Sequence, residues 1–279
     1  MSRLSVVLAT YNENINFLKA CIDSLLNQTF RDFELIIVTE PYEKNRDYLR
    51  NISAMDSRIK ILENETKLGI SSSRNRAIME SSGKYIAFID GDDYCDLRRF
   101  EMQVKFLEDN PLISVVGSNI LLVDENNNFV GERIYPEVHR DIKKRFLLSM
   151  PVANPTVMMR RKDIEDIGLF DIKLSKAEDF ELWFRFLANG KKMHNLQENL
   201  VYYRVQTKQS DRRGAVHWRN NYSVRKKYSK LIWPLHSRCM SLSILFIISH
   251  APSFFSDYIL NSRLVEKIKS LKLHQRCNS

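Results

Sequence analysis

The chain has 279 residues, of which 44% are hydrophobic and 28% are charged, and its formal net charge is +9. This length and apolar content allow one substantial buried core and exclude an intrinsically disordered chain. The four cysteines form no CxxC pair, which argues against a zinc site and a disulfide framework and favours a reducing compartment.

The first 96 residues alternate short β-rich runs with helical patterns. We expect strands at residues 4–9, 34–39, 59–63 and 85–89, and helices at 16–28, 45–55 and 71–82. Ser71 or Ser72 is the expected N-cap of the third helix. The N-terminus enters its strand without the features of a signal peptide, which favours a cytoplasmic protein. The alternation predicts an α/β fold with a mixed, mainly parallel sheet flanked by helices.

Beyond residue 96 the pattern becomes mixed. We expect a helix at 98–108, β-like runs at 114–123 and 129–134, and a helix at 140–148. The sequence therefore predicts one domain over residues 1–205, with halves at 1–96 and 97–205, and a basic helical extension at 206–279.

The positive charge is confined to the last part of the chain. Residues 1–203 hold 28 Lys and Arg against 31 Asp and Glu, whereas residues 204–279 hold 15 against 3. This tail has no groove-reading motif, so we expect no nucleic-acid partner. Its segment 239–256 has no charged side chain. We consider three interpretations of that segment: contact with an anionic membrane surface, a buried helical hairpin, or a true membrane span.

The residues that follow the strands are the first candidates for a site, because parallel sheets bind ligands at the carboxyl ends of their strands. Asp90-Gly91-Asp92-Asp93 places three carboxylates within four positions. Such groups repel one another unless a cation lies among them, and hard oxygen ligands favour Mg²⁺ or Mn²⁺. The glycine would let the backbone approach a ligand closely. A solvated acidic turn is the alternative.

Five ordered motifs resemble those of family two glycosyltransferases. They read SVVLATYNE at 5–13, SLLNQTFRDFELIIV at 24–38, LGISSSRN at 68–75, GKYIAFIDGDD at 83–93 and ED at 178–179. The resemblance covers residues 4 to about 205. It implies a GT-A (Rossmann-like) fold, a nucleotide-sugar donor bound at the strand ends by the half at 1–96, and inversion of the anomeric centre in one displacement.

The resemblance also implies the donor-binding residues. Ala9, Thr10 and Tyr11 would line the nucleotide base, and Glu40 would bond it, where most relatives carry Asp-Asp-Gly-Ser; uracil is the favoured base. Arg74 would lie near the base and diphosphate, unless it is an arginine of the helix surface. The remaining residues are Asp90 at the ribose, Gly91, and Asp92 as the ligand of Mn²⁺ or Mg²⁺, with Asp90 beside it. Asp93 is expected to cap the following helix.

Asp179 would be the catalytic base that takes the proton of the acceptor hydroxyl, with Glu178 raising its pKa by like-charge repulsion. The helical apolar stripe at 180–187 places this pair at a helix N-terminus, where a cap and dipole role is the alternative. Trp183 in that stripe is expected in the core. We also expect structural or exposed roles for His139, His194 and His217.

The last strand is expected to end at Tyr203-Arg204 without the histidine that many relatives place after it, which speaks against a metal ligand there. Arg204 and three basic residues of the next segment form either a flexible lid over the diphosphate or a solvated loop; the three are Lys208, Arg212 and Arg213.

These features predict a metal-dependent hexosyl- or N-acetylhexosaminyltransferase. It would move a sugar from a UDP-sugar to a lipid-linked oligosaccharide in surface polysaccharide (O-antigen or capsule) biosynthesis, at the inner face of the cell membrane. The stretch 134–156 in the half at 97–205 would shape the acceptor pocket. A nucleotidylyltransferase would need a glycine-rich basic loop where Thr10-Tyr11-Asn12-Glu13 stands. A catalytically inactive sugar-binding relative is the alternative.

Overall fold

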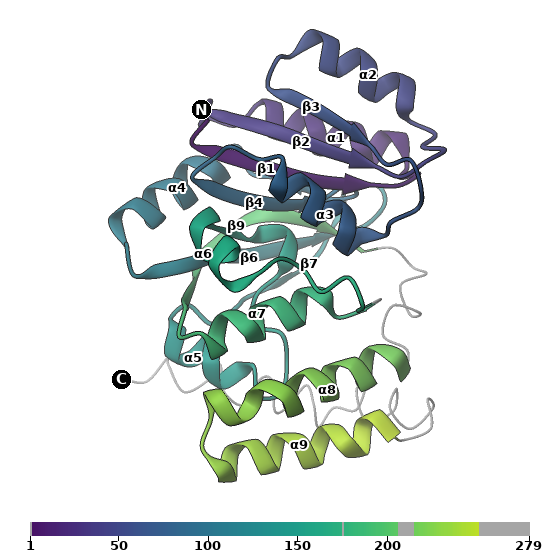
Figure 1. Cartoon of the computed structure of the whole chain (residues 1–279). Coiled ribbons are helices and arrows are strands. Elements are labelled where there is room, and N and C mark those ends of the chain that lie inside the picture. The colour runs from purple at the N-terminus through teal and green to yellow at the C-terminus, as the bar shows by residue number, and fades with distance from the viewer. Residues whose placement is uncertain (1, 175, 206–214, 251–279) are drawn as a thin grey trace. The chain divides into compact units, whose positions relative to one another are not determined.

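The computed structural model describes residues 2–174, 176–205 and 215–250 of the chain (Figure 1). The chain divides into two units, residues 1–209 and 210–279. The strands of the first unit are β1 (Leu4–Thr10), β2 (Phe33–Thr39), β3 (Ile59–Glu63), β4 (Tyr85–Asp90), β5 (Tyr94–Cys95), β6 (Ile113–Val123), β7 (Phe129–Arg133), β8 (Met158–Arg160) and β9 (Lys192–Arg204). Its helices are α1 (Ile15–Leu26), α2 (Arg46–Met55), α3 (Ile70–Met79), α4 (Arg99–Asp109), α5 (His139–Arg145), α6 (Arg161–Ile167) and α7 (Glu178–Ala188), with a 3-10 turn η1 (Asn154–Thr156).

The sheet has a parallel half and a mixed half. Its strand order is β3-β2-β1-β4-β8-β6-β9-β5, and β7 pairs with β6. The first four strands in that order run parallel, with Leu4 of β1 opposite Phe33 on one side and Tyr85 on the other. Their carboxyl ends therefore meet at one edge of the sheet, which is the edge where a ligand is expected.

The mixed half brings the end of β9 to the acidic turn. β8 runs antiparallel to β4 and β6, and β9 runs parallel to β6. The short β5 directly follows the acidic turn, and it pairs antiparallel with β9 at Tyr94↔Tyr202 and Cys95↔Val201. The turn at 90–93 is thus held between β4 and the last residues of β9.

The sheet is buried on both faces, as the near-continuous apolar runs of its central strands require (Figure 1). Leu4, Val6 and Leu8 of β1 share one core cluster with residues of α1 and α4. Val7 is also buried, on the face that alternation assigns to the opposite side of the sheet. The predicted mixed α/β fold is confirmed, and each predicted element lies within a few residues of an observed one. β5, β8 and α6 were not predicted.

The second unit is described through α8 (Ala215–Ile232) and α9 (Leu235–His250), which form a helical hairpin packed by Tyr222 against Phe246 at 5.8 Å between ring centroids. No helix of the described chain has the length and apolarity needed to cross a bilayer. Residues 251–256 of the uncharged segment lie outside the described residues.

Candidate active site

Arg74 joins the end of β4 to the start of α7. Its Nη2 donates to Asp90 Oδ1 at 2.8 Å, and its Nη1 donates to Glu178 Oε1 at 3.3 Å. The side chain is only 7% exposed and its guanidinium lies near the rings of Phe88 and Phe170. Arg74 is therefore a buried residue of the strand-end cluster, and the helix-surface alternative is wrong.

The acidic pair begins α7, as predicted. Ala177, the residue before the pair, has φ 67°, a left-handed conformation that costs a non-glycine residue free energy and is often found at functional sites. Asp179 Oδ1 accepts a hydrogen bond from the backbone N–H of Phe180 at 2.7 Å. One carboxylate oxygen of Asp179 is thus held within the first turn of the helix.

The pKa of Asp179 is raised from its ordinary 3.8 to about 7. Burial is the largest cause and the negative charge of Glu178 is the next, while Arg74 acts in the opposite direction. A carboxylate with a pKa near the working pH can accept a proton in a reaction and release it afterwards. The geometry therefore provides a group with the acidity required of a general base.

Asp93 is the last residue of the acidic turn; its carboxylate contacts the end of β9 and does not cap a helix. Its N–H donates to Asp90 O at 3.1 Å, and its Oδ1 accepts from the backbone N–H of Arg204 at 2.9 Å. Burial raises its pKa well above the ordinary value, and the charges of Asp92 and Asp90 add to this. The cap prediction was wrong because β5 intervenes before α4, whose N-cap is Arg98.

Arg204 is fully buried and does not belong to a flexible lid. Its Nε donates to the backbone oxygen of Asp92 at 2.9 Å, and its Nη1 donates to that of Asp124 at 3.0 Å. The lid prediction was wrong for this residue, because its guanidinium binds carbonyl groups beneath the turn. Lys208, Arg212 and Arg213 lie outside the described residues.

Glu40 fixes the start of α3. Its carboxylate accepts hydrogen bonds from the backbone N–H groups of Leu68 at 2.9 Å and Gly69 at 2.8 Å, and from Ser73 Oγ at 3.0 Å. Gly69, with φ 81°, is the N-cap of the helix, so the predicted Ser71 or Ser72 cap was wrong. The acid that follows β2 thus binds the backbone N–H of the N-cap from a distant segment, as the glutamate of a capping box does from within its helix.

The loop after β1 is tied to the loop after β2. Asn12 has φ 56°, and its N–H donates to Glu43 Oε2 at 2.7 Å. Tyr11 is 41% exposed, and Lys67 Nζ lies 4.6 Å from its ring centroid. Glu43 and Lys67 were not predicted as site residues; Glu43, an acid three positions after Glu40, was the available signal.

Thr10, Thr39 and Gly91 complete the floor of the site. The hydroxyl oxygens of Thr10 and Thr39 are buried and have no hydrogen-bond partner among the described residues. A Cβ on Gly91 would lie 3.2 Å from Glu13 Cγ and 3.5 Å from Thr10 Oγ1. The glycine thus permits the close approach of the β1 and β4 ends, beside hydroxyl groups that a ligand could satisfy.

The acidic turn fits a divalent cation whose other ligands come from the substrate. No group of three or more His, Cys, Asp or Glu that could hold a metal occurs within the described ranges. Asp90, which pairs with Arg74, and Asp92 are the carboxylates that would hold it, and Mg²⁺ is usually held by one or two carboxylates together with substrate phosphates. Burial raises the pKa of Asp93 most and the negative charges of Asp92 and Asp90 add to this; these two charges are the ones that such a cation would neutralise.

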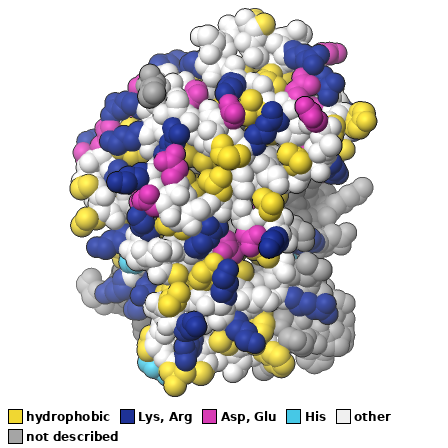
Figure 2. Space-filling view, viewed as in Figure 1, with side chains coloured by type: hydrophobic (Ala, Val, Ile, Leu, Met, Phe, Trp, Pro, Cys, Tyr) yellow, Lys and Arg dark blue, Asp and Glu magenta, His cyan; other side chains and the backbone are white. Residues whose placement is uncertain are grey.

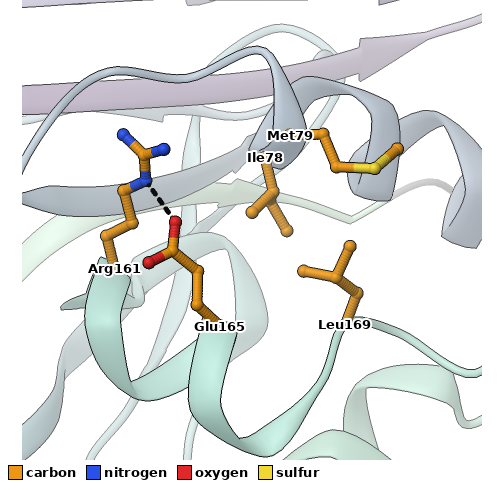
Figure 3. A pocket seen from close by; sticks show the side chains of 5 residues that line it. All are labelled: Ile78, Met79, Arg161, Glu165 and Leu169. Atoms are coloured by element: carbon orange, nitrogen blue, oxygen red, sulfur yellow. Dashed lines mark hydrogen bonds and ion pairs between the residues drawn. The ribbon is translucent and has the colours of Figure 1, made fainter.

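The remaining predicted residues lie away from this chemistry. Trp183 is fully buried in the core, as predicted. His194 stacks on Phe106 at 4.4 Å, and His139 accepts from the N–H of Met193 at 3.3 Å, so both are structural. A hollow of about 330 Å³ opens elsewhere, and Figure 3 shows its lining: Ile78, Met79, Arg161, Glu165 and Leu169. None of the predicted site residues lines it.

Residues 5–168 match the family model described as "Glycosyl transferase family 2". An uncharacterized glycosyltransferase of Methanocaldococcus jannaschii is 35% identical over 82% of this chain and 76% of its own length. The Escherichia coli O-antigen biosynthesis glycosyltransferase WbnJ is 30% identical over 82% of this chain and 91% of its own. The E. coli UDP-Glc:alpha-D-GlcNAc-diphosphoundecaprenol beta-1,3-glucosyltransferase WfgD is 28% identical over 67% of this chain and 70% of its own.

Two solved structures share the fold. S. aureus TarS in complex with UDP-GlcNAc has a TM-score of 0.67 and 18% identity, over 95% of this chain and 77% of the other. The mannosyltransferase PcManGT of Pyrobaculum calidifontis, in complex with GDP-Man and Mn²⁺, has a TM-score of 0.66 and 12% identity, over 98% of this chain and 81% of the other. At these identities the likeness establishes the fold alone.

Proposed function

The chain belongs to glycosyl transferase family 2, and on that premise we propose that it moves a sugar from a UDP-sugar to a hydroxyl of a lipid-linked oligosaccharide, with inversion. The observation that carries this proposal is the link that Arg74 makes between Asp90 and Glu178. It holds the acids that follow β4 close to the acidic pair of α7, so donor-binding and proton-accepting groups belong to one cluster.

Asp179 is the general base of the proposed reaction. With a pKa of about 7, an appreciable fraction of it is ionised at neutral pH. Its carboxylate accepts the proton of the acceptor hydroxyl while that oxygen attacks the anomeric carbon, and the nucleoside diphosphate leaves from the opposite face. Burial raises the pKa of Asp179 most, and the negative charge of Glu178 raises it further. Arg74 lowers this pKa and donates a hydrogen bond to Glu178.

The donor occupies the carboxyl ends of the parallel strands. Ala9, Thr10 and Tyr11 line the base, and the buried hydroxyl of Thr10 offers a hydrogen bond there. Asp90 and Asp92 would hold Mn²⁺ or Mg²⁺, which would supply positive charge to neutralise the diphosphate. Glu40 can also bind the base, because a carboxylate has about four lone-pair sites and three accept from Leu68, Gly69 and Ser73. The name of the relative WfgD, which specifies UDP-Glc as donor, supports a UDP-sugar.

The acceptor is a lipid-linked oligosaccharide in surface polysaccharide biosynthesis. The name of the relative WfgD, which specifies a diphosphoundecaprenol acceptor, supports this, as does the O-antigen role in the name of WbnJ. We assign the acceptor pocket to the stretch 134–156, which contains Pro136, Pro151 and Pro155. The sugar moved is a hexose or an N-acetylhexosamine.

The hairpin of α8 and α9 is proposed to contact the anionic inner face of the cell membrane. The described part of this unit has no acidic residue, and Figure 2 shows basic and hydrophobic side chains on it. Lys226, Lys227 and Lys230 of α8 are exposed. Among the described side chains of α9, the exposed large apolar ones are Leu235, Met240, Ile244 and Phe246. Exposed basic groups together with exposed apolar side chains in one helical unit favour contact with an anionic membrane surface.

Nucleotide release from a panel of UDP-, GDP- and dTDP-sugars, with Mn²⁺ or EDTA, tests the proposed activity. We expect metal-dependent release of UDP that is lost in Asp92→Ala. Donor binding measured on the same proteins separates the alternatives. A chain that binds UDP-sugars but neither releases UDP nor transfers to lipid-linked acceptors would be an inactive relative, and a chain that binds no nucleotide-sugar would contradict the proposal.

A further inference from the structure

Arg204 binds the acidic turn from below at two adjacent residues. Its side-chain Nε donates to the backbone oxygen of Asp92, and its own backbone N–H donates to Asp93 Oδ1, both at 2.9 Å. The side chain that ends β9 thus contacts the peptide unit after Asp92, and its main chain holds the next residue. The position of Asp92 in the turn therefore depends on a residue 112 positions away.

The same guanidinium also holds the turn between β6 and β7. Its Nη1 donates to the backbone oxygen of Asp124 at 3.0 Å and approaches that of Glu125 at 3.5 Å. The fork of donors on an arginine can bind carbonyl groups of two segments at once, whereas the single ammonium of lysine is a point charge on a flexible chain. Lysine at this position would keep the positive charge but could not donate to carbonyl groups of both segments in the same way.

Aromatic rings enclose this contact. The guanidinium carbon of Arg204 lies 4.0 Å from the ring centroid of Phe17 and 5.7 Å from that of Tyr94. The residue is 1% exposed. Burying a charge in this way is costly unless its hydrogen bonds are satisfied, so the arrangement defines one orientation of the side chain.

We propose that Arg204 is a positioning residue that orients the Asp90–Asp93 turn and thereby sets the affinity of the site for a divalent cation in the presence of a nucleoside diphosphate. This rests on the proposed function, because it takes Asp92 as a cation ligand. Arg204 acts through the backbone of Asp92 and through Asp93, and does not contact the cation itself.

Arg160 provides a matched control. Its Nε donates to the backbone oxygen of Ile113 at 2.8 Å, and its Nη2 donates to those of Leu107 and Asn110 at 2.6 and 3.1 Å. It is thus another arginine that binds several carbonyl groups, but it lies in β8, opposite Tyr85 at the amino-terminal end of β4. Arg160→Lys removes the same kind of contact at the opposite end of that strand from the acidic turn.

The test is the Kd of Mn²⁺, measured by electron paramagnetic resonance at fixed UDP, for the wild type, Arg204→Lys and Arg160→Lys, with the Tm of each protein. Replacing a residue that orients metal ligands typically lowers the affinity for the metal by about 10- to 100-fold. We expect Arg204→Lys to weaken Mn²⁺ binding by about tenfold or more, and Arg160→Lys to lower the Tm without changing the Kd.

Equal Kd values for the two variants and the wild type would overturn the role of Arg204 while leaving the proposed function intact. A wild type that binds neither UDP nor Mn²⁺ would overturn both. If Arg204→Lys does not fold, Phe17→Leu decides the matter, because it removes the ring over the guanidinium and leaves the arginine in place. It should then weaken Mn²⁺ binding measurably, and an unchanged Kd would overturn the assignment.

Discussion

Arg74 and Glu178 form an ion pair at 3.3 Å although they lie 104 positions apart in the chain. The pair connects α3, in the half that carries the first strand ends, with α7, in the half that follows. Through the second contact of Arg74, to Asp90, it also connects the proposed donor site with the proposed base. Charge changes in this cluster should therefore alter both the acidity of Asp179 and the function of the site.

Replacing Glu178 by Gln should move the acidic limb of the pH–rate profile to lower pH. The negative charge of Glu178 raises the pKa of Asp179, so its removal lets Asp179 ionise at lower pH. We expect the apparent pKa of the acidic limb, measured on kcat/KM, to fall by about half a unit to one unit. Arg74→Gln removes a charge that lowers this pKa, so its residual activity should shift the opposite way.

Glu181→Gln is the matched control for the pH measurement, because Glu181 lies in the same first turn of α7 but pairs with Arg185. It should leave the acidic limb in place. Identical profiles for Glu178→Gln and the wild type would show that Glu178 does not tune the base.

Asp179→Asn should abolish transfer and yet stabilise the protein above neutral pH. The folded-state pKa of Asp179 is raised to about 7 from 3.8, so the folded protein binds the proton more tightly than the unfolded chain does. The corresponding stability is fully present below about pH 4 and is lost as the pH rises through 7. Asparagine cannot ionise, so we expect the variant to be more stable than the wild type at pH 8 by about 4 kcal/mol, because the pKa rises from 3.8 to about 7 and one pKa unit corresponds to about 1.4 kcal/mol.

Denaturant unfolding of the two proteins at pH 5 and pH 8 measures this difference. The gain should appear mainly at pH 8. A variant that is less stable than the wild type at both pH values would contradict this. It would mean that Asp179 stabilises the fold through its contact with the N–H of Phe180, and that its ionised form does not destabilise the folded protein.

Glu40→Gln should destabilise the chain even without a nucleotide. The carboxylate accepts from two backbone N–H groups and from Ser73, and a glutamine amide has only one acceptor oxygen. Loss of a hydrogen bond to a charged group costs about 1.5–3 kcal/mol. We expect a lower Tm together with a higher KM for the donor. A higher KM with an unchanged Tm would mean that Glu40 contacts the base but does not stabilise α3.

Reversing the charge of Lys226, Lys227 and Lys230 to Glu should weaken binding to anionic vesicles and leave donor binding unchanged. Each basic residue near an anionic surface contributes about 1 kcal/mol, and the attraction is screened by salt. Sedimentation with phosphatidylglycerol vesicles at low and high salt measures the effect. The matched control reverses three exposed lysines of the first unit, Lys84, Lys105 and Lys162. Equal loss in both variants would contradict a docking role for α8.

Much of the parallel half could be predicted from the sequence, because its strands and helices follow distinct hydrophobic periods. The residues after β4 could be identified as a candidate site for the same reason: a strand end and a run of acids are both local features. The place of Asp179 at the start of a helix followed from the apolar stripe after it. Its role as the base rests on the family motif and stays a prediction.

The errors concern contacts between distant segments. Glu40, which follows β2, accepts from the N–H of the N-cap Gly69, a contact that no pattern around α3 indicates. Arg204 precedes a basic segment and was therefore grouped with it, whereas its side chain is buried against carbonyl groups of Asp92 and Asp124. The short β5 was missed because two residues carry no periodicity, and its presence removed Asp93 from the helix it was expected to cap.

The most direct test of the central claim compares UDP-sugar binding and UDP release for the wild type and Asp179→Asn at pH 7.5 with Mn²⁺ and a lipid-linked acceptor. We expect the variant to bind the donor with the Kd of the wild type and its transfer rate to fall by at least about 100-fold, the scale of general-base catalysis. Transfer at the wild-type rate by the variant would contradict the assignment of Asp179 as the base.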